Sequence, residues 1–479
     1  MKFEQSRRCF LSASLAATML PRISRAASPN DEFRVAVLGL RWRGQQLTHE
    51  FIKVPGVRVA ALCDPDSKLL AERSEELASL AHAPKRYVDP RQVMDDTEID
   101  AVAIATPNHW HSLLGIWACQ AGKDVYIEKP VSHNLFEGWQ LLNAARKHRR
   151  IVQTGTQNRS DTGLREAASQ IHSGRLGAVR LVRGLCYNRR PSTGMVTAPQ
   201  PVPKDVDYNI WSGPAELESI MRKQFHYDWH WNYTYGNGDV GNQGVHELDI
   251  CRWMIGADDL PATAISVGGR FGYEDNANTP NTLVTYLGYE PAPILFEVRG
   301  LPAKANEKRM DTHRGKSVGL VVECENGYFA GGRGGGNLYD SDGQLIQSCP
   351  GDNGDTHAAN FIDAVRSRDA TTLHAEIAEG VLSSGLSHFC NLSYQSGEPI
   401  AREQITERLL SEPIAAKAFD RMANHLEANK IDLSEAAVTL GPMLKWDSAT
   451  RRFEGNDQAN QLLTRQYRKP FVVPDLSTT

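Results

Sequence analysis

Residues 124–130, Asp-Val-Tyr-Ile-Glu-Lys-Pro, join the end of an apolar strand directly to an acid–base pair. Val125, Tyr126 and Ile127 are typical of a buried strand, and no turn residue separates them from the charges that follow. In an open parallel sheet, ligands bind in the crevice beyond the carboxyl ends of the strands. Lys129 at such a position can contact a ligand, and burial or a nearby positive charge can lower its pKa enough for it to move a proton. The alternative is a surface lysine ahead of a loop proline, and the flanking sequence has to decide between the two.

The flanking sequence alternates between strands and helices on both sides of this stretch. Short apolar runs recur, and most are followed by a longer segment with helical periodicity. Such a succession predicts a doubly wound parallel sheet, in which several strand ends meet at one edge. The expected strands are 33–39, 57–62, 99–106, 124–128 and 151–154, and the expected helices are 44–53, 71–82, 112–121 and 135–147.

The first strand runs into Gly39-Leu-Arg-Trp-Arg-Gly44, a glycine turn that leads to a helix. A strand, a glycine turn and a helix N-terminus form the setting in which a pyrophosphate binds. The next strand ends at Asp64, twenty residues after Gly44, where a carboxylate accepts from a ribose 2'-hydroxyl and repels a 2'-phosphate. This order favours NAD over NADP. The middle position of the motif is Arg41 in place of glycine, and its guanidinium could pair with a phosphate at the cost of a shifted loop.

Three further strand ends carry polar residues that should converge on the same edge of the sheet. They are 106–111 (Thr-Pro-Asn-His-Trp-His), 128–130 (Glu-Lys-Pro) and 157–159 (Gln-Asn-Arg). We expect them to line the cofactor site, because the crevice of a doubly wound sheet lies there. The predicted cofactor contacts are Gly39, Arg41, Trp42, Arg43, Gly44, Asp64, Thr106, Asn108, His111, Glu128, Lys129 and Gln157.

The pattern changes after residue 160. Strand-like runs separated by turn residues predict an α/β domain with an open, mainly antiparallel sheet and helices on one face. The glycine cluster at 331–336 favours a mobile hairpin loop over a phosphate cradle, because no helix follows it. The predicted division is a signal peptide (1–26), a linker (27–32), a Rossmann domain (33–157), a substrate and oligomerisation domain (158–395) and a helical and extended tail (396–479).

Composition describes an ordinary globular chain of 479 residues, 41% apolar and 23% charged. The formal net charge is -4, and the first 26 residues hold five basic groups and one acid, so the remainder is near -8. No basic block is present, which argues against nucleic acid or an anionic membrane as a partner. No 18-residue apolar run occurs outside the N-terminus, so we expect no membrane span.

The N-terminus is typical of an export signal. Ser6-Arg7-Arg8-Cys9-Phe10-Leu11 resembles the twin-arginine motif, and Ser24-Arg25-Ala26 is a small-residue cleavage site. We therefore expect the twin-arginine export machinery as a partner and a periplasmic or extracytoplasmic location; an untargeted tail is the alternative. Because twin-arginine substrates fold before export, under reducing conditions, the seven cysteines after the signal should be mostly free and buried.

Taken together, these residues resemble the glucose–fructose oxidoreductase / inositol dehydrogenase (Gfo/Idh/MocA) family over about 33–395. The motifs that carry the resemblance are the glycine turn with Asp64, Ala-Thr-Pro-Asn-His-Trp-His111, Glu-Lys-Pro130 and Gly-Val-His-Glu-Leu-Asp249. The resemblance implies a Rossmann domain and an open-sheet α/β domain with NAD or NADP between them, and a homo-oligomer. It also implies that Lys129 contacts nicotinamide and substrate, and that Pro130 commonly follows a cis peptide.

The resemblance further implies that His246 is the catalytic acid/base, with Asp249 as a partner of the substrate or of His246. Many dehydrogenases of the family carry aspartate four residues before this histidine, where this chain has Asn242. An amide can orient a hydroxyl or an imidazole but cannot accept a proton as a carboxylate does. Proton transfer would then rest on Lys129 and His246.

An aromatic stretch at 225–231 supplies further candidates. His226, Asp228 and His230 alternate, so on a strand they would share one face, beside the flat ring of Trp229. We expect them to bind sugar hydroxyls rather than a metal, because no third neutral ligand is apparent. The predicted substrate contacts are Asn242, Asp249, Arg159, His226, Asp228, His230 and Trp229, and we predict no metal site.

Export sharpens the functional prediction, because no pool of free nicotinamide cofactor exists outside the cytoplasm. We predict an NAD(P)-dependent oxidoreductase that acts on a hydroxyl of a sugar, polyol or glycoside and keeps its cofactor tightly bound. The alternative is a redox-neutral NAD-dependent glycosidase or epimerase that uses transient oxidation. A non-catalytic sugar- or cofactor-binding protein is the third possibility.

Overall fold

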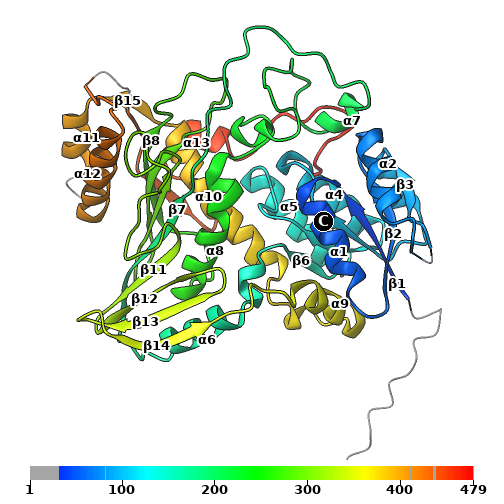
Figure 1. Ribbon diagram of the computed structural model, residues 1–479, viewed down its shortest axis with the longest axis horizontal. Helices are drawn as coiled ribbons and strands as arrows, with labels where there is room; N and C mark the ends of the chain where they lie inside the picture. Colours follow the sequence, from blue (N-terminus) through cyan, green and yellow to red (C-terminus); the bar gives the residue numbers. More distant parts are fainter. Residues whose placement is uncertain (1–31, 81, 410–411, 435–437, 478–479) are drawn as a thin grey trace, which may run out of the picture. The chain divides into compact units, whose positions relative to one another are not determined.

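In the computed structural model, which describes residues 32–80, 82–409, 412–434 and 438–477, the chain builds two β-sheets (Figure 1). The first sheet has six strands and the second has twelve. The predicted signal peptide and all but the last residue of the predicted linker lie outside the described residues. In the described part of the chain, no helix is both long and apolar enough to cross a membrane.

The first sheet is parallel throughout, in the order β3-β2-β1-β4-β5-β6. This confirms the predicted doubly wound sheet. The three-residue strand β3 and the six-residue helix α3 were not predicted, because neither is long enough to show a periodic apolar signal. The elements are β1 (Phe33–Leu38), α1 (Trp42–Ile52), β2 (Val57–Cys63), α2 (Ser67–Glu76), β3 (Lys85–Tyr87), α3 (Pro90–Asp95), β4 (Ala101–Ile104), α4 (Asn108–Gln120), β5 (Asp124–Ile127), α5 (Leu135–Lys147) and β6 (Val152–Thr154).

Alternate residues of β1 belong to two different cores, as the pleat of a strand requires. Val35 and Val37 lie in the cluster that contains α1 and α9 (His357–Ser367), whereas Ala36 and Leu38 lie in the one that contains α4 and α5. Helix α9 comes from the second half of the chain and packs through Phe361 against Phe51 of α1. The Rossmann core is therefore completed by residues far outside 33–157.

The second sheet is antiparallel except where β7 and β10 pair in parallel. Its strands are β7 (Val179–Tyr187), β8 (Thr263–Gly269), β9 (Thr282–Gly288), β10 (Ile294–Arg299), β11 (Val318–Cys324), β12 (Gly327–Gly332), β13 (Gly335–Asp340), β14 (Leu345–Pro350), β15 (Glu398–Ile400), β16 (Val438–Leu440), β17 (Leu444–Asp447) and β18 (Arg452–Phe453). The helices against one face are α6 (Thr162–His172), α8 (Val245–Met254) and α10 (Ile377–Gln395).

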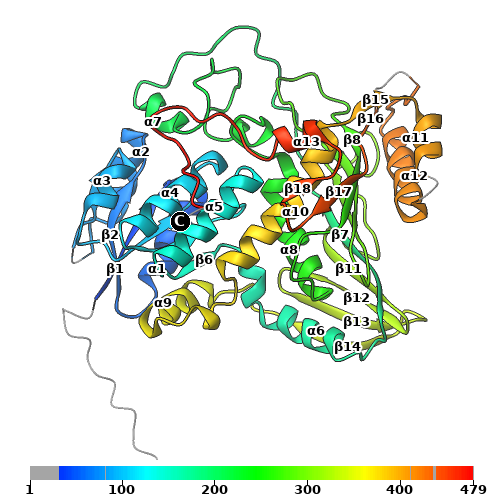
Figure 2. The same ribbon diagram turned by 180° about the vertical axis from the view of Figure 1, so that it is seen from behind.

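The predicted helices on one face of this sheet are confirmed, and the tail covers part of the other face. Helices α11 (Arg402–Arg408) and α12 (Pro413–Ala428) pack Ile405, Phe419 and Met422 onto the strand residues of that face. The expectation of a helical and extended tail missed β15 to β18, which join or pair with this sheet, and the short helix α13 (Asp457–Gln461) follows them. Figure 2 shows the last residues then crossing to α4 and α5, where Phe471 packs on Trp110.

Residues 188–236 follow β7 and make up most of the connection to α8; they are named here the covering segment. It contains α7 (Tyr208–Ser212), which lies beside α2 in Figures 1 and 2. Two backbone hydrogen bonds fasten it to the β2–α2 connection: Ser67 N–H donates to Asp205 O (2.8 Å) and Asp207 N–H donates to Pro65 O (2.9 Å), and together they form the antiparallel bridge between Asp66 and Val206. The covering segment therefore lies over the carboxyl end of the Rossmann sheet.

Candidate active site

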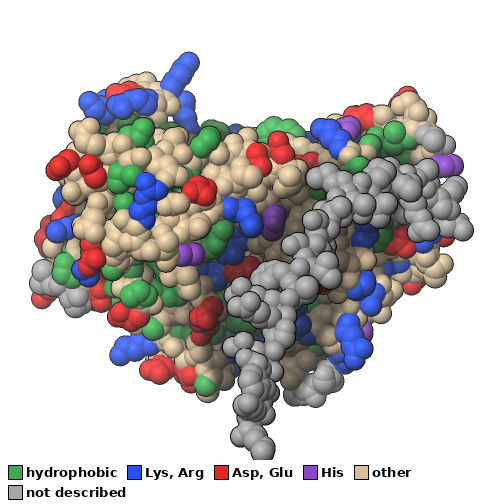
Figure 3. All heavy atoms as spheres, turned by 90° about the horizontal axis from the view of Figure 1, so that it is seen from below, with side chains coloured by type: hydrophobic (Ala, Val, Ile, Leu, Met, Phe, Trp, Pro, Cys, Tyr) green, Lys and Arg blue, Asp and Glu red, His purple; other side chains and the backbone are tan. Residues whose placement is uncertain are grey.

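A cavity of about 1570 Å³ lies where the strand ends of the Rossmann sheet face the covering segment and the start of α8. Its walls include Lys129 and His246, the two predicted catalytic residues. Most of the predicted cofactor contacts also line it; Gly44 does not. On the face of the molecule drawn in Figure 3, Lys and Arg side chains are interspersed with Asp and Glu.

The glycine turn has the geometry of a phosphate-binding loop. Gly39 has a φ of +81°, and a Cβ on Gly44 would lie 1.7 Å from the carbonyl oxygen of Gly39, so α1 can approach the turn only without a side chain there. Arg41 precedes α1 with a φ of -75° and ψ of -177°, an ordinary extended conformation, and its side chain does not cap the helix. The first N–H groups of α1 have no intrahelical acceptor, which suits an anion.

Asp64 is buried at the end of β2 and accepts two backbone hydrogen bonds, from Leu40 N (2.8 Å) and Asp66 N (2.9 Å). Burial raises its pKa to about 6 against the effect of these bonds. The carboxylate thereby holds the glycine turn to the next strand end. The contact of Asp64 with a ribose stays a prediction. The carboxylate has lone pairs left to accept a hydrogen bond from a ribose hydroxyl.

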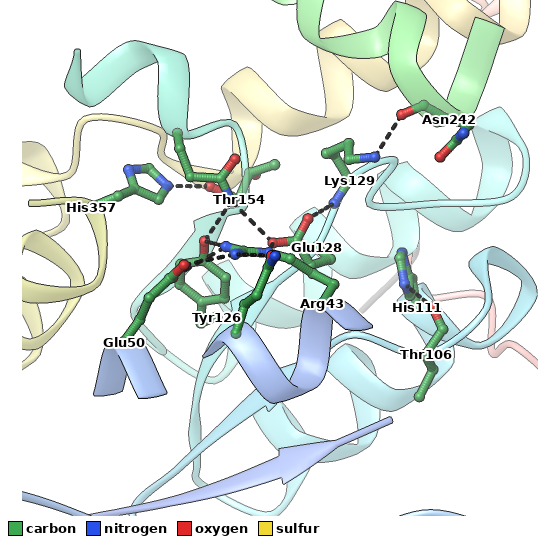
Figure 4. A network of polar contacts seen from close by, with 12 residues as sticks. Arg43, Glu50, Thr106, His111, Tyr126, Glu128, Lys129, Thr154, Asn242 and His357 are labelled. Atoms are coloured by element: carbon green, nitrogen blue, oxygen red, sulfur yellow. Dashed lines mark hydrogen bonds and ion pairs between the residues drawn. The ribbon is translucent and has the colours of Figure 1, made fainter. Parts of the chain in front are cut away.

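Glu128 is the centre of a polar cluster at the strand ends (Figure 4). It accepts from Arg43 Nε (2.6 Å) and Gln157 Nε2 (3.1 Å), and Arg43 also donates to Glu50 (2.7 Å). A Cβ on Gly155 would lie 2.6 Å from Glu128 Oε1, so this glycine makes room for the carboxylate. Burial disfavours the Glu128 charge, but the neighbouring positive charges, first that of Arg43, leave its pKa lowered.

Lys129 follows this cluster and donates from Nζ to the backbone carbonyl of Asn242 (2.6 Å). The peptide bond to Pro130 is cis, as the family resemblance implied. Burial lowers the pKa of Lys129, and the positive charge of Arg43 lowers it further against the opposing effect of Glu128. Figure 4 shows the lysine amine directed at Asn242, which lies on the opposite wall of the cavity. Lys129 contacts the main-chain carbonyl of Asn242 and not its side-chain amide.

His246 is the second residue of α8 and follows a π-helical turn, η4 (Val240–Gly244). Its Nδ1 is buried and has no hydrogen-bond partner among the described residues. Burial, followed by the positive charges of Lys129 and Arg333, lowers its pKa well below 6.5, so the ring is neutral at pH 7. The same cavity is therefore lined by a neutral imidazole, that of His246, and by Lys129, whose pKa is lowered.

Other predicted contacts serve to position the strand ends. His111 lies with Nδ1 2.6 Å from Pro130 O and Nε2 2.7 Å from Thr106 O, so the ring bridges the ends of β4 and β5. Asn108 Nδ2 donates to Asn237 Oδ1 (3.0 Å), and Asn237 is the residue directly after the covering segment. Trp42, at the first turn of α1, is 77% exposed on the cavity rim.

The aromatic stretch is not a strand, and the expectation that its alternate residues share a face was wrong. Residues Asp228–Trp231 form a 3-10 turn, η3, in which Asp228 accepts from Gln224 N (2.8 Å) and does not line the cavity. His226 contacts Asp66 (3.0 Å). His230 donates from Nδ1 to Tyr227 O (2.6 Å) and stacks on Trp229 at 3.7 Å, so its Nε2 is left as an acceptor on the cavity wall.

Arg159 and Asp249 are no longer candidates for substrate contact, because they pair with each other away from the cavity. Arg159 Nε donates to Asp249 Oδ1 (2.8 Å), and Ser383 Oγ donates to the same oxygen (2.6 Å). Ser383 belongs to α10, so the Asp249 carboxylate is directed at that helix. Burial of the pair explains why neither side chain lines the cavity.

Several cavity residues escaped the sequence analysis. They come from the hairpin between β12 and β13, from the end of β7 and from the loop before α9. A single arginine inside the glycine cluster at 331–336 was a usable signal, and the expectation of a hairpin there was correct. The residues concerned are Asn188, Arg333, Asn353, Gly354, Asp355 and Thr356, together with Gln243 of η4.

Cysteines and metal ligands complete the inventory. All seven cysteines in the described part of the chain are free, and six of them are buried, which confirms the prediction for these residues. The described residues contain no group of three or more His, Cys, Asp or Glu side chains placed to hold a metal ion.

Comparison with known proteins assigns the family. A model described as "Oxidoreductase family, NAD-binding Rossmann fold" matches residues 33–156, and the model of the same family's C-terminal alpha/beta domain matches 179–296. Together they match about half of the chain. The chain belongs to the Gfo/Idh/MocA oxidoreductase family.

Relatives within the Gfo/Idh/MocA family are distant. The scyllo-inositol 2-dehydrogenase (NAD(+)) of Bacillus subtilis is 27% identical over 240 residues, 50% of this chain and 58% of that protein. The myo-inositol 2-dehydrogenase of Thermotoga maritima is 27% identical over 225 residues, 47% of this chain and 55% of that protein. This chain therefore spans little more than half the length of these relatives.

A solved structure supports the Gfo/Idh/MocA fold. The WlbA dehydrogenase of Bordetella pertussis, in complex with NADH and UDP-GlcNAcA, gives a TM-score of 0.56 over 75% of this chain and 95% of that chain. At 17% identity this likeness concerns the fold alone.

Proposed function

We propose that this protein oxidises a hydroxyl of a sugar or polyol with an NAD that stays bound in the cavity. One observation carries the proposal: a single cavity is lined by the glycine turn before α1, by Lys129 and, facing the lysine, by His246. Lowered proton affinities at such paired groups are typical of catalytic sites. The relatives named for inositol oxidation support the substrate class.

The residues present fit NAD. Gly39 and Gly44 leave a cradle that a Cβ would fill, and the uncapped start of α1 faces it. Asp64 supplies a carboxylate at the end of β2, where it favours a free 2'-hydroxyl over a 2'-phosphate. NAD, when bound, supplies the hydride acceptor. Arg41 is exposed beside this cradle, so it does not fill the space.

Proton handling falls to Lys129 and His246. The ammonium of Lys129 is held by the Asn242 carbonyl and keeps two further protons to donate to a substrate hydroxyl oxygen. His246 is neutral at pH 7, so a ring nitrogen can accept the hydroxyl proton as the C–H bond is broken. Asn242 leaves this pair without the additional carboxylate of many relatives, so the lysine charge stabilises the developing alkoxide alone.

The covering segment supports tight retention of the cofactor. It lies over the end of the cavity nearest Asp64, where Trp211, Gln224 and His226 line the wall. Its contacts with the β2–α2 connection include two backbone hydrogen bonds and the His226–Asp66 contact. Release of a dinucleotide from this end requires these contacts to open together.

The test is native mass spectrometry of the purified full chain, followed by addition of myo-inositol, scyllo-inositol or glucose. We expect NAD to travel with the protein and NADH absorbance to appear in the protein fraction after gel filtration. Free NADH that accumulates in proportion to added NAD contradicts retention. Absence of NADH with every sugar and polyol contradicts the oxidation itself.

A redox-neutral glycosidase is the less favoured alternative. A glycosyl hydrolase family 109 protein of Shewanella is 31% identical, but over 120 residues that cover only 24% of this chain and 26% of that protein. Release of a reducing sugar from an aryl glycoside without any external acceptor distinguishes this reaction from net oxidation.

Location and assembly complete the proposal. We propose export by the twin-arginine route and assembly as a homo-oligomer, on the sequence features given above. Fractionation of expressing cells, with Arg7 and Arg8 both replaced by Lys, tests export, and light scattering of the purified protein tests assembly. Retention of the double variant in the cytoplasm is the expected result for a twin-arginine substrate.

A further inference from the structure

Arg333, on the cavity wall opposite the glycine turn, has no counter-charge among the residues that the structure describes. Among the arginines that line the cavity, Arg43 pairs with Glu128, Arg73 with Glu76 and Arg190 with Asp239. Arg333 makes no side-chain hydrogen bond or ion pair with any residue that the structure describes, and it is exposed to the cavity. Arg41 is likewise unpaired, but it belongs to the glycine turn of the cofactor cradle.

The backbone around Arg333 is firmly held although its side chain is not. Arg333 and Gly334 form the two-residue turn of the β12–β13 hairpin, and Gly334 has a φ of +86°. Buried Asp161 accepts from Gly334 N (3.0 Å) and from Asn353 N (2.9 Å), and Gly334 O accepts from Gly351 N (2.9 Å). The turn is therefore fixed against α6 and the loop before α9, and the guanidinium projects from a rigid base.

This guanidinium lies within electrostatic reach of the candidate base. After burial and Lys129, the charge of Arg333 contributes to the lowered pKa of His246. The loop 353–356 and the first turn of α9 line the same part of the cavity, and the helix N-terminus adds partial positive charge. Asp355 is the acid on this rim, and it forms no ion pair with Arg333.

We propose that Arg333 binds a carboxylate of the substrate, so that the protein prefers a sugar acid of the uronate type to a neutral sugar. The inference rests on the proposed function and specifies its substrate class. The planar fork of a guanidinium matches a carboxylate through two parallel hydrogen bonds. A carboxylate held there places the hydroxyl-bearing ring between the hairpin turn and His246.

The experiment is isothermal titration calorimetry of the full chain, as purified with its cofactor, against sodium D-glucuronate, sodium D-galacturonate, D-glucose and D-glucose 6-phosphate. We expect at least one uronate to bind about 10- to 100-fold more tightly than glucose. Arg333→Gln should abolish this preference, and Arg333→Lys should restore part of it. Arg180→Gln, which removes an exposed arginine of β7 that pairs with Glu325, is the control for net charge and should keep the preference.

Two results overturn the proposal: no uronate binds more tightly than glucose, or the preference persists in Arg333→Gln. Arg333-dependent preference for glucose 6-phosphate over both uronates overturns the assignment of a carboxylate. Because binding is measured without turnover, the result is separable from the proposed function. The Lys129→Met variant should keep the uronate preference, and wild-type protein that binds uronates selectively but forms no NADH refutes the oxidation while leaving the role of Arg333 intact.

Discussion

The two walls of the cavity differ in how far the chain itself satisfies their ionisable groups. On the Rossmann wall, Asp64 holds two backbone amides and Glu128 holds both Arg43 and Gln157. On the opposite wall, His246 Nδ1 and the guanidinium of Arg333 have no partner among the described residues. The first wall is organised before any ligand binds, whereas the second presents groups that a ligand can pair.

This difference indicates a division of labour. A cofactor wall built from internally paired charges keeps its shape when NAD binds, so little reorganisation is required. An unpaired buried nitrogen costs about 1–3 kcal/mol, and a substrate that supplies the missing partner recovers that free energy at the reacting centre. Lys129 connects the two walls, because it extends from the end of β5 to the carbonyl of Asn242.

Removing this connection should have the largest effect. We expect Lys129→Met to lower kcat/KM by about 10²- to 10⁴-fold, because both the donor to the hydroxyl and the charge that stabilises the alkoxide are lost. Bound NAD should be retained, since the glycine turn is untouched. Steady-state kinetics and native mass spectrometry check the two statements, with Lys147→Met, an exposed lysine of α5, as the matched control. Wild-type rates in Lys129→Met would remove the lysine from the mechanism.

A pair of variants on α8 separates catalysis from stability. Asp249→Asn removes the buried one of the two carboxylates that pair with Arg159, whereas Glu379 remains at 3.0 Å. It should lower the free energy of unfolding by about 3 kcal/mol, the lower end for a broken buried pair, with KM unchanged at a temperature where the variant stays folded. His246→Asn should do the reverse, with about a 10²-fold loss of kcat and little change in stability. Chemical denaturation and steady-state kinetics of both variants decide. A raised KM in Asp249→Asn would return Asp249 to the substrate site.

The parts of the cavity that the sequence predicts are those whose contacting residues lie close together along the chain. The cofactor wall was predictable because its signals are local: a strand, two glycines five positions apart in the motif, and Asp64 at the next strand end. Glu128 and Lys129 were found for the same reason, as residues directly after a buried strand. The boundaries of α5 were also predicted to the residue.

The substrate wall depends on contacts between residues far apart, and there the sequence was less informative. Arg159 and Asp249 are 90 residues apart, so neither helical spacing nor charge could reveal that they pair. Alternating polar and aromatic residues at 226–230 imitated a strand, whereas hydrogen bonds within the segment bend it into η3. The turn that carries Arg333 is held by Asp161, which accepts from the N–H of Gly334, a residue 173 positions further along the chain.

A smaller effect should follow from loosening the covering segment. His226→Ala removes the contact with Asp66 and leaves the two backbone hydrogen bonds, so we expect NAD to dissociate about two- to fivefold faster, the range of a partly exposed polar pair. Dissociation of bound NADH into excess NAD, followed by fluorescence, measures this rate. Tyr233→Phe, in the same segment but hydrogen-bonded to Asn391, is the control. An unchanged rate would mean that the contact with Asp66 does not limit release.

The smallest effect concerns the pH dependence of the reaction. His246 must be neutral to accept a proton, so activity should be lost as the pH falls through its pKa, and the acid limb of kcat/KM should lie well below pH 6.5. Arg333 disfavours the protonated ring, so Arg333→Gln should raise this pKa and move the limb upward by about a few tenths of a unit. The pKa of His246 in this variant should stay below 6.5, because burial and the positive charge of Lys129 still lower it. A neutral substrate is used so that lost carboxylate binding does not distort the profile; a limb that does not move would place Arg333 too far from His246 to act on it.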